Sequence, residues 1–289
     1  MTRKKRVDIH QIVTDQIIAK LEAGTKDWKK SWATMAGGLP LRENGQPYKG
    51  INVLILMIQG RANPNWLTYK KAAELKGQVR SGEKGTKVVF FKSLTVEDKV
   101  SGEDKSIPMI RSFTVFNAEQ IDGLPARYYP KAEDRNAEPR LDDADAYIAA
   151  TGAVIAHGGG RAFYAPSRDS IQLPDFESFD DPVAYYGTAL HELIHWTGHE
   201  SRLDRDLKTG YGTKDYAREE LVAELGAAFA AATMGIETEV RDDHAEYLAS
   251  WLKVLKEDKK AIFKAAAAAQ KAVDYLDGFQ EVEMEAVAA

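Results

Sequence analysis

The stretch that most constrains this chain is residues 191–195, which read HELIH and match the pattern HExxH. On a helix, positions four apart lie on one face, so His191 and His195 can both point an imidazole nitrogen at one ion. Glu192 then lies beside that ion, where a carboxylate can hold a water molecule and take its proton. The pattern predicts two metal ligands and a general base on one helix.

The flanking residues favour one continuous helix. Asp181 is a candidate N-cap, Pro182 suits the first turn, and Gly198 offers a stop. His199 would lie about 12 Å beyond His191 along a straight helix, so we interpret it as a helix-end residue and not as a ligand. The alternative is a chance match on an ordinary amphipathic helix.

A second predicted helix, rich in alanine, offers the third protein ligand that a catalytic metal site needs. Glu220 and Glu224 share one face of it, and Glu219 lies off that face. Two carboxylates among apolar neighbours are costly to bury without a cation. The alternative is a solvated acidic face, since charged helix positions are usually exposed.

Charge divides the chain of 289 residues into two halves. Residues 1–130 hold 22 Lys and Arg against 13 Asp and Glu, and the remainder holds 17 against 31. The basic half should favour a polyanion. We therefore predict domains at 1–130 and 141–289, joined by a polar linker at 131–140.

Composition also excludes several classes. No apolar run approaches the ~20 residues of a membrane span, and the basic N-terminus lacks the apolar stretch of a signal peptide. The absence of Cys excludes disulfides and thiolate ligands. We expect a cytoplasmic protein whose metal is held by His and carboxylates.

Periodicity predicts an α+β fold, with a mixed α/β N-terminal domain and a mainly helical C-terminal domain that carries a small sheet. The strand at 170–173, just before the HExxH helix, is expected to be a sheet edge that could receive an extended peptide. Residues 97–106 are expected to form an exposed loop. Further helices are predicted at 7–23, 53–58, 70–76, 142–151, 242–258 and 259–275, and further strands at 88–91, 110–117 and 161–164.

The basic half also contains aromatic and glycine-rich patterns. Two tryptophans bracket two lysines at residues 28–32, where the rings can stack on bases and the lysines can pair with phosphates. Tyr48 and Lys49 form a second aromatic–cation pair. The turn at 80–87 offers free backbone N–H groups beside cations, which suits a phosphate. The alternatives are two tryptophans in a small core and a plain hairpin loop.

The order of these motifs resembles the ArdC family of plasmid antirestriction proteins, and also the N-terminal region of conjugative primases that share the module. The resemblance covers nearly the whole chain. It is carried by Trp28 and Trp32, by residues 48–52, 66–69, 82–85 and 115–117, and by residues 164–174, 191–199 and 219–224. It implies a single-stranded-DNA-binding N-terminal domain and a zincin-like metallopeptidase C-terminal domain.

The resemblance also implies roles for residues. The acids of the second helix look like the ExxxD pair of glutamate zincins, so Glu220 would bind the metal and Glu224 would orient a histidine. Because the second acid is Glu and not Asp, the two roles could be exchanged. The expected ion is Zn²⁺, with another divalent ion such as Mn²⁺ as the alternative. The candidate DNA contacts are Trp28, Lys29, Lys30, Trp32, Tyr48, Lys49, Asn52, Trp66, Tyr69, Arg80, Lys84 and Lys87.

The favoured hypothesis is an antirestriction protein that binds single-stranded DNA and carries a peptidase-type metal site. It would protect incoming plasmid DNA during conjugation, with a component of the host restriction machinery as a candidate protein substrate. A second hypothesis keeps DNA binding and makes the metal site structural or inactive. A nuclease is a weaker third hypothesis, since HExxH offers a single mononuclear site.

Overall fold

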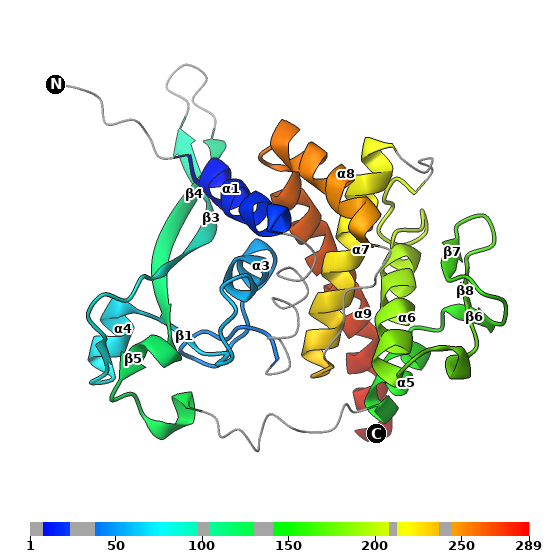
Figure 1. The fold of residues 1–289 in the computed structure, drawn as a ribbon, viewed down its shortest axis with the longest axis horizontal. Coiled ribbons are helices and arrows are strands. Elements are labelled where there is room, and N and C mark those ends of the chain that lie inside the picture. The colour runs from blue at the N-terminus through cyan, green and yellow to red at the C-terminus, as the bar shows by residue number, and fades with distance from the viewer. Residues whose placement is uncertain are drawn as a thin grey trace.

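The computed structural model describes residues 8–23, 38–97, 104–129, 141–207, 213–236 and 244–288. Its helices and small sheets confirm the predicted α+β class. Figure 1 shows a sheet-containing N-terminal half on one side and a helical C-terminal half on the other. The predicted linker at 131–140 lies outside the described residues.

The N-terminal half is built around a long β-hairpin. Strand β4 is central in a three-stranded antiparallel sheet of order β1-β4-β3, and β2 pairs with β5. Figure 1 shows the hairpin curving along one side of the molecule, with α1 and α3 beside it. The elements are α1 (Ile9–Glu22), α3 (Ile51–Met57), β1 (Trp66–Thr68), α4 (Tyr69–Glu74), β2 (Gln78–Val79), β3 (Thr86–Glu97), β4 (Asp104–Asn117) and β5 (Ile121–Asp122), with 3-10 turns at Ala118–Gln120 and Ala126–Tyr128.

The prediction of a loop at residues 97–106 is wrong at both of its ends. Strand β3 extends to Glu97, and β4 already begins at Asp104, which pairs with it. Residues 97–106 are largely polar, so no hydrophobic alternation marks them as strand. Backbone pairing between the two strands extends the hairpin as far as Glu97 and Asp104.

The C-terminal half is a helical layer with a small sheet at its side. Helices α6, α7 and α9 pack against one another, and α8 covers α7 (Figure 1). None of the described helices combines the length and apolar character that crossing a bilayer requires. The elements are α5 (Leu141–Ala150), β6 (Val154–His157), β7 (Phe163–Ala165), β8 (Ser170–Leu173), α6 (Pro182–Thr197), α7 (Lys214–Thr233), α8 (His244–Glu257) and α9 (Ala261–Ala288), with a 3-10 turn at Phe176–Ser178.

The strand that precedes the HExxH helix is not a sheet edge, contrary to expectation. Strand β8 lies between β6, which pairs with it in parallel, and β7, which pairs antiparallel. The strand at Val154–His157 was not predicted, and it occupies the free side of β8. Any added strand would therefore meet β6 or β7.

A polar cluster fastens this small sheet to the end of α6. Arg202 donates to Asp169 at 2.9 Å, and Tyr164 donates to the same carboxylate at 2.7 Å. The Arg202 guanidinium also lies 3.9 Å from the Trp196 ring centroid. The turn between β7 and β8 is thus tied to the helix that carries HExxH.

One hydrophobic core includes residues from both halves. Ile17 of α1 and Leu54 of α3 belong to the same buried cluster as Trp251 of α8 and Ala266 of α9. Polar contacts cross as well, because the Gly50 N–H donates to Gln270 Oε1 at 2.9 Å. The two halves are therefore packed together, and the domain boundaries at 130 and 141 stay a prediction.

Candidate metal centre and nucleic-acid surface

Helix α6 forms for the reasons that its sequence indicates. The Asp181 carboxylate accepts from the Ala184 N–H at 2.8 Å, Pro182 occupies the first turn, and Gly198 is the C-cap. The helix is buried from Thr188 to Thr197. This burial places the two histidines inside the protein, where their orientation is set by packing and not by solvent.

The structure brings His191, His195 and Glu220 together. The two Nε2 atoms are 3.2 Å apart, and each lies 3.5 Å from an oxygen of the Glu220 carboxylate. Helix α7 supplies the carboxylate to helix α6, so the cluster joins two helices. His199 is outside it, with Nδ1 2.8 Å from Ser201 Oγ.

These separations fit a metal ion. A tetrahedral site with bonds of about 2.0–2.2 Å spaces neighbouring ligand atoms by about 3.4 Å. The three observed separations lie close to that value, and all three ligand atoms fall within 4.8 Å of one another. Two imidazoles and one carboxylate suit a divalent ion with a position left open.

The opposite ring nitrogens of both histidines are also held by acids. His191 Nδ1 lies 3.4 Å from Glu224, and His195 Nδ1 lies 3.2 Å from Glu219. The role of Glu219 was missed because it lies off the face that Glu220 and Glu224 share. When two Nε2 atoms converge, their Nδ1 atoms diverge, so their partners need not share a helix face.

Arg205 completes this support and was also missed. Its guanidinium donates to Glu219 Oε1 at 2.9 Å, to Thr197 Oγ1 at 2.8 Å and to the Ile194 carbonyl at 2.6 Å. A Cβ on Gly198 would lie 2.9 Å from Arg205 Nη2. Gly198 therefore both ends the helix and leaves room for Arg205. No pattern in the sequence distinguishes Arg205, which lies in the loop after the helix.

The centre stabilises positive charge. Burial disfavours a charged imidazole, but the carboxylates of Glu220 and Glu224 outweigh it and raise the pKa of His191 to about 10. At His195, burial again disfavours the charged imidazole, but the carboxylates of Glu219 and Glu220 outweigh this effect and raise its pKa to about 9. Burial would raise the pKa of Glu220, yet the two imidazoles hold that pKa well below its usual range. A divalent cation would satisfy the same buried carboxylates.

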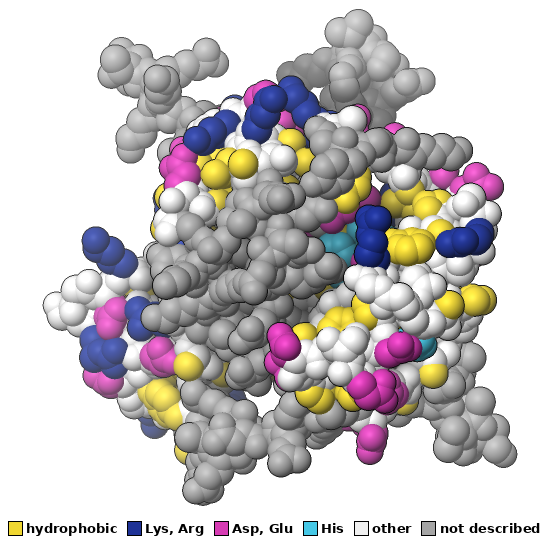
Figure 2. Space-filling model, turned by 45° about the vertical axis from the view of Figure 1, so that its right-hand side comes forward, with side chains coloured by type: hydrophobic (Ala, Val, Ile, Leu, Met, Phe, Trp, Pro, Cys, Tyr) yellow, Lys and Arg dark blue, Asp and Glu magenta, His cyan; other side chains and the backbone are white. Residues whose placement is uncertain are grey.

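Glu192 is buried next to His191 and is 5 % exposed. Within the described part of the chain, no hydrogen bond or ion pair engages its carboxylate, unlike those of Glu219 and Glu220. Figure 2 shows histidine atoms, drawn in cyan, at the surface beside acidic and basic side chains. A buried carboxylate beside the ligands is suited to hold a water or to accept a substrate proton.

Close approach of α6 and α7 depends on Gly226. A Cβ at this position would lie 2.8–3.0 Å from three carbons of the Ile194 side chain. We expect Gly226→Ala to reduce the free energy of unfolding by about 1–3 kcal/mol through overpacking. Gly278→Ala is the matched control, because that exposed helical glycine has nothing within 4 Å, and it should gain about 0.5–1 kcal/mol. Denaturant unfolding of both variants measures this, and equal gains would contradict the packing argument.

The predicted DNA contacts fall into three groups. Trp28, Lys29, Lys30 and Trp32 lie outside the described residues. A second group is internal: Trp66 is 2 % exposed and Tyr48 is 7 % exposed, and Asn52 donates to and accepts from the Val89 backbone at 2.9 and 2.8 Å. The rings of Trp66 and Tyr48 are therefore buried in the N-terminal half, and the partly buried Asn52 amide is bonded to the backbone of β3.

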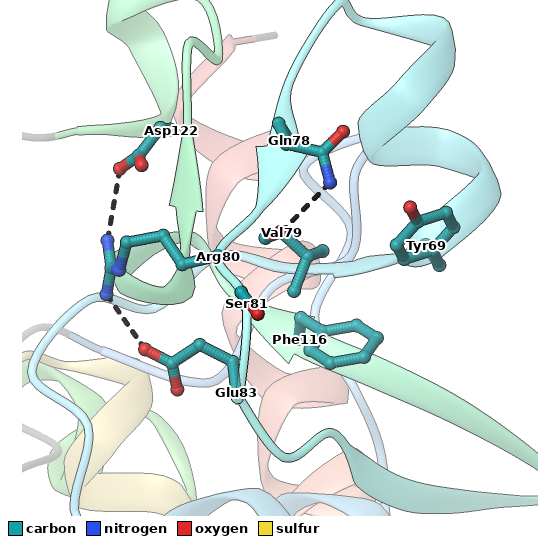
Figure 3. Close-up of a pocket in the computed structure, with 8 residues that line it drawn as sticks. All are labelled: Tyr69, Gln78, Val79, Arg80, Ser81, Glu83, Phe116 and Asp122. Carbon is teal, nitrogen blue, oxygen red and sulfur yellow. Dashed lines mark hydrogen bonds and ion pairs between the residues drawn. The ribbon is translucent and has the colours of Figure 1, made fainter.

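The remaining contacts lie on the surface, but two of them are already paired. Lys49 forms an ion pair of 2.8 Å with Asp274 of α9. Arg80 lies between Asp122 and Glu83, at 3.1 and 3.0 Å, as Figure 3 shows. Both cations would have to exchange a carboxylate for a phosphate.

Tyr69, Lys84 and Lys87 remain available. Tyr69 is 56 % exposed and lines a cavity of about 670 Å³ together with Phe116 and Arg80 (Figure 3). Lys84 and Lys87 are exposed and form no ion pair among the described residues. Of the predicted contacts within the described residues, Tyr69 and Arg80 line this one cavity.

Comparison with known proteins agrees with this architecture. Residues 142–268 match the zincin-like metallopeptidase family model, and residues 7–116 match the N-terminal domain of the anti-restriction factor ArdC. The structure is similar to crystal structures of the antirestriction ArdC protein from the R388 plasmid. The metal-free form is 46 % identical with a TM-score of 0.81, covering 94 % of this chain and 98 % of that one. The Mn(II)-bound form is 45 % identical with a TM-score of 0.78 and the same coverage.

Among sequence relatives, protein y4eC of Sinorhizobium fredii is 38 % identical over 96 % of this chain and 94 % of its own length. Two Escherichia coli DNA primases TraC are 41 % and 42 % identical over 96 % of this chain, which spans only 20 % and 28 % of their length. The paired helices therefore belong to a zincin-like domain. The chain as a whole belongs to the ArdC family of antirestriction proteins, which confirms the resemblance seen in the sequence.

Proposed function

We propose that this chain is an antirestriction protein that binds single-stranded DNA through residues 1–130 and hydrolyses a peptide bond at the metal centre of residues 141–289. The convergence of His191, His195 and Glu220 beside the buried carboxylate of Glu192, which forms no hydrogen bond or ion pair among the described residues, supports the peptidase part. In this role the protein protects incoming plasmid DNA during conjugation, with a component of the host restriction machinery as its substrate. Zn²⁺ is the proposed ion, and the Mn(II)-bound relative makes Mn²⁺ the alternative.

The residues divide the chemistry among them. When bound, a divalent ion supplies a Lewis acid for the scissile carbonyl and makes water more acidic. His191, His195 and Glu220 would hold it. Glu192 accepts the proton of the attacking water on a carboxylate oxygen and delivers it to the departing amine nitrogen.

The surrounding acids keep the ligand geometry. Glu224 and Glu219 orient the two imidazoles through their Nδ1 atoms, and Arg205 prevents Glu219 from turning away. Because Glu219 and Glu224 are buried, protein atoms and not solvent set the orientation of the two imidazoles.

A transfer experiment tests the proposed biological role. A conjugative plasmid with and without the intact gene is delivered to recipients that possess or lack a restriction system. We expect loss of the gene to lower transfer into restricting recipients, since unprotected DNA is cut, and to leave transfer into the others unchanged. An equal loss in both recipients would contradict an antirestriction role.

A further inference from the structure

The β3–β4 hairpin places two aromatic rings and two cations on one of its faces. Directly opposed residues of an antiparallel pair share a face, and Phe90 lies opposite Arg111. Phe113 lies opposite Val88, two residues before Phe90, and therefore belongs to the same face. Lys92, two residues after Phe90, belongs to it as well.

The two rings are half exposed, which is unusual for phenylalanine. Phe90 is 50 % exposed and Phe113 is 49 % exposed, and their centroids are 6.2 Å apart with an interplanar angle of 58°. Leaving two such rings in water forgoes the burial that aromatic side chains normally gain. Paired, tilted and accessible, the rings are available to flat apolar ligands.

The cations on this face are also available. Arg111 and Lys92 are exposed, and neither forms an ion pair within the described part of the chain. Residues 86–92 and 109–116 contain no Asp or Glu. This part of the hairpin is therefore positively charged, although the C-terminal half of the chain is acidic.

We propose that the Phe90 face, formed by Phe90, Lys92, Arg111 and Phe113, is where single-stranded DNA lies. The rings stack on nucleobases, and the two cations pair with the phosphates between them. A paired duplex hides the flat faces of its bases, so the rings favour an unpaired strand. This inference rests on the proposed DNA-binding function and assigns it to residues outside the contacts that the sequence predicted.

The neighbouring Phe91 provides a matched control. It is 56 % exposed, similar to Phe90, but its register partner is Ile110, so it lies on the opposite face. Its ring meets Phe263 of α9 edge-on, with centroids 6.3 Å apart. Phe91 is therefore as accessible and as apolar as Phe90, yet it lies on the face opposite to the proposed DNA site.

The experiment compares Phe90→Leu, Phe113→Leu and Phe91→Leu in the full-length protein. Leucine keeps the apolar character and removes the stacking ring. Binding to a fluorescent oligo(dT) is followed by anisotropy at several salt concentrations, and circular dichroism melting verifies the fold. We expect Phe90→Leu and Phe113→Leu each to weaken binding about 5- to 100-fold and Phe91→Leu to leave it unchanged. Arg111→Gln should reduce the slope of log affinity against log salt by about 0.7.

The outcomes are distinguishable. If the wild-type protein does not bind the oligonucleotide, the proposed function fails together with this site. If it binds and Phe91→Leu weakens binding as much as Phe90→Leu, the assignment to this face is overturned while DNA binding stands. Sedimentation velocity of the wild-type protein and the same variants tests whether the Phe90 face binds a second copy of the chain instead. A wild-type dimer that Phe90→Leu dissociates would overturn the proposal, because the face would then be a contact between copies.

Discussion

Glu192→Gln is expected to abolish peptide hydrolysis while leaving metal binding intact. Glutamine keeps the size of the buried side chain but cannot accept the proton of the attacking water. Loss of a general base typically lowers the rate about 10²- to 10⁴-fold. Since Glu192 is not among the three clustered ligands, metal content should stay that of the wild type.

The same variant separates the two hypotheses for the metal centre. Metal content is measured by elemental analysis, and plasmid protection by transfer into restricting recipients. Protection lost with metal retained supports catalysis, whereas intact protection shows that DNA binding alone suffices. Glu200→Gln is the control, because Glu200 is exposed just beyond α6 and should change neither quantity.

Glutamine substitutions of the three acids of α7 should weaken metal binding to different extents. The Glu220 carboxylate lies 3.5 Å from both Nε2 atoms, so Glu220→Gln replaces a charged ligand. We expect it to lower the metal affinity by more than about 100-fold, which exceeds the effect typical of residues that only orient a ligand. Glu224 and Glu219 contact the Nδ1 atoms instead. Their substitution should lower the affinity about 10- to 100-fold each.

Calorimetric titration of the metal-free protein with Mn²⁺ or Zn²⁺ measures this order. Glu257→Gln is a suitable control, because this acid of α8 pairs with Lys214 on the surface, far from the ligands in sequence and role. If Glu224→Gln proved more damaging than Glu220→Gln, the two acids would have exchanged roles, as the sequence alone allowed. Equal effects of all three would argue for a diffuse electrostatic site without a defined ligand shell.

Some features of the fold could be predicted from the sequence because they depend on residues that are neighbours along the chain. The ends of α6 follow from Asp181, Pro182 and Gly198, and each acts within one turn. Other features depended on partners far away. The prediction that β8 is a sheet edge was wrong because β6 pairs with its free side, and Trp66, a predicted DNA contact, lies in the core.

The sequence by itself determined that two imidazoles and a carboxylate would occupy one helix, since a four-residue interval is one turn of any α-helix. It also determined that the first half is basic and the second acidic. Only the tertiary structure decided which acid meets the histidines, because that depends on how closely α7 approaches α6 at Gly226. Likewise, only strand pairing decided that Phe90 and Phe113 share a face, since register joins residues that the chain keeps more than twenty positions apart.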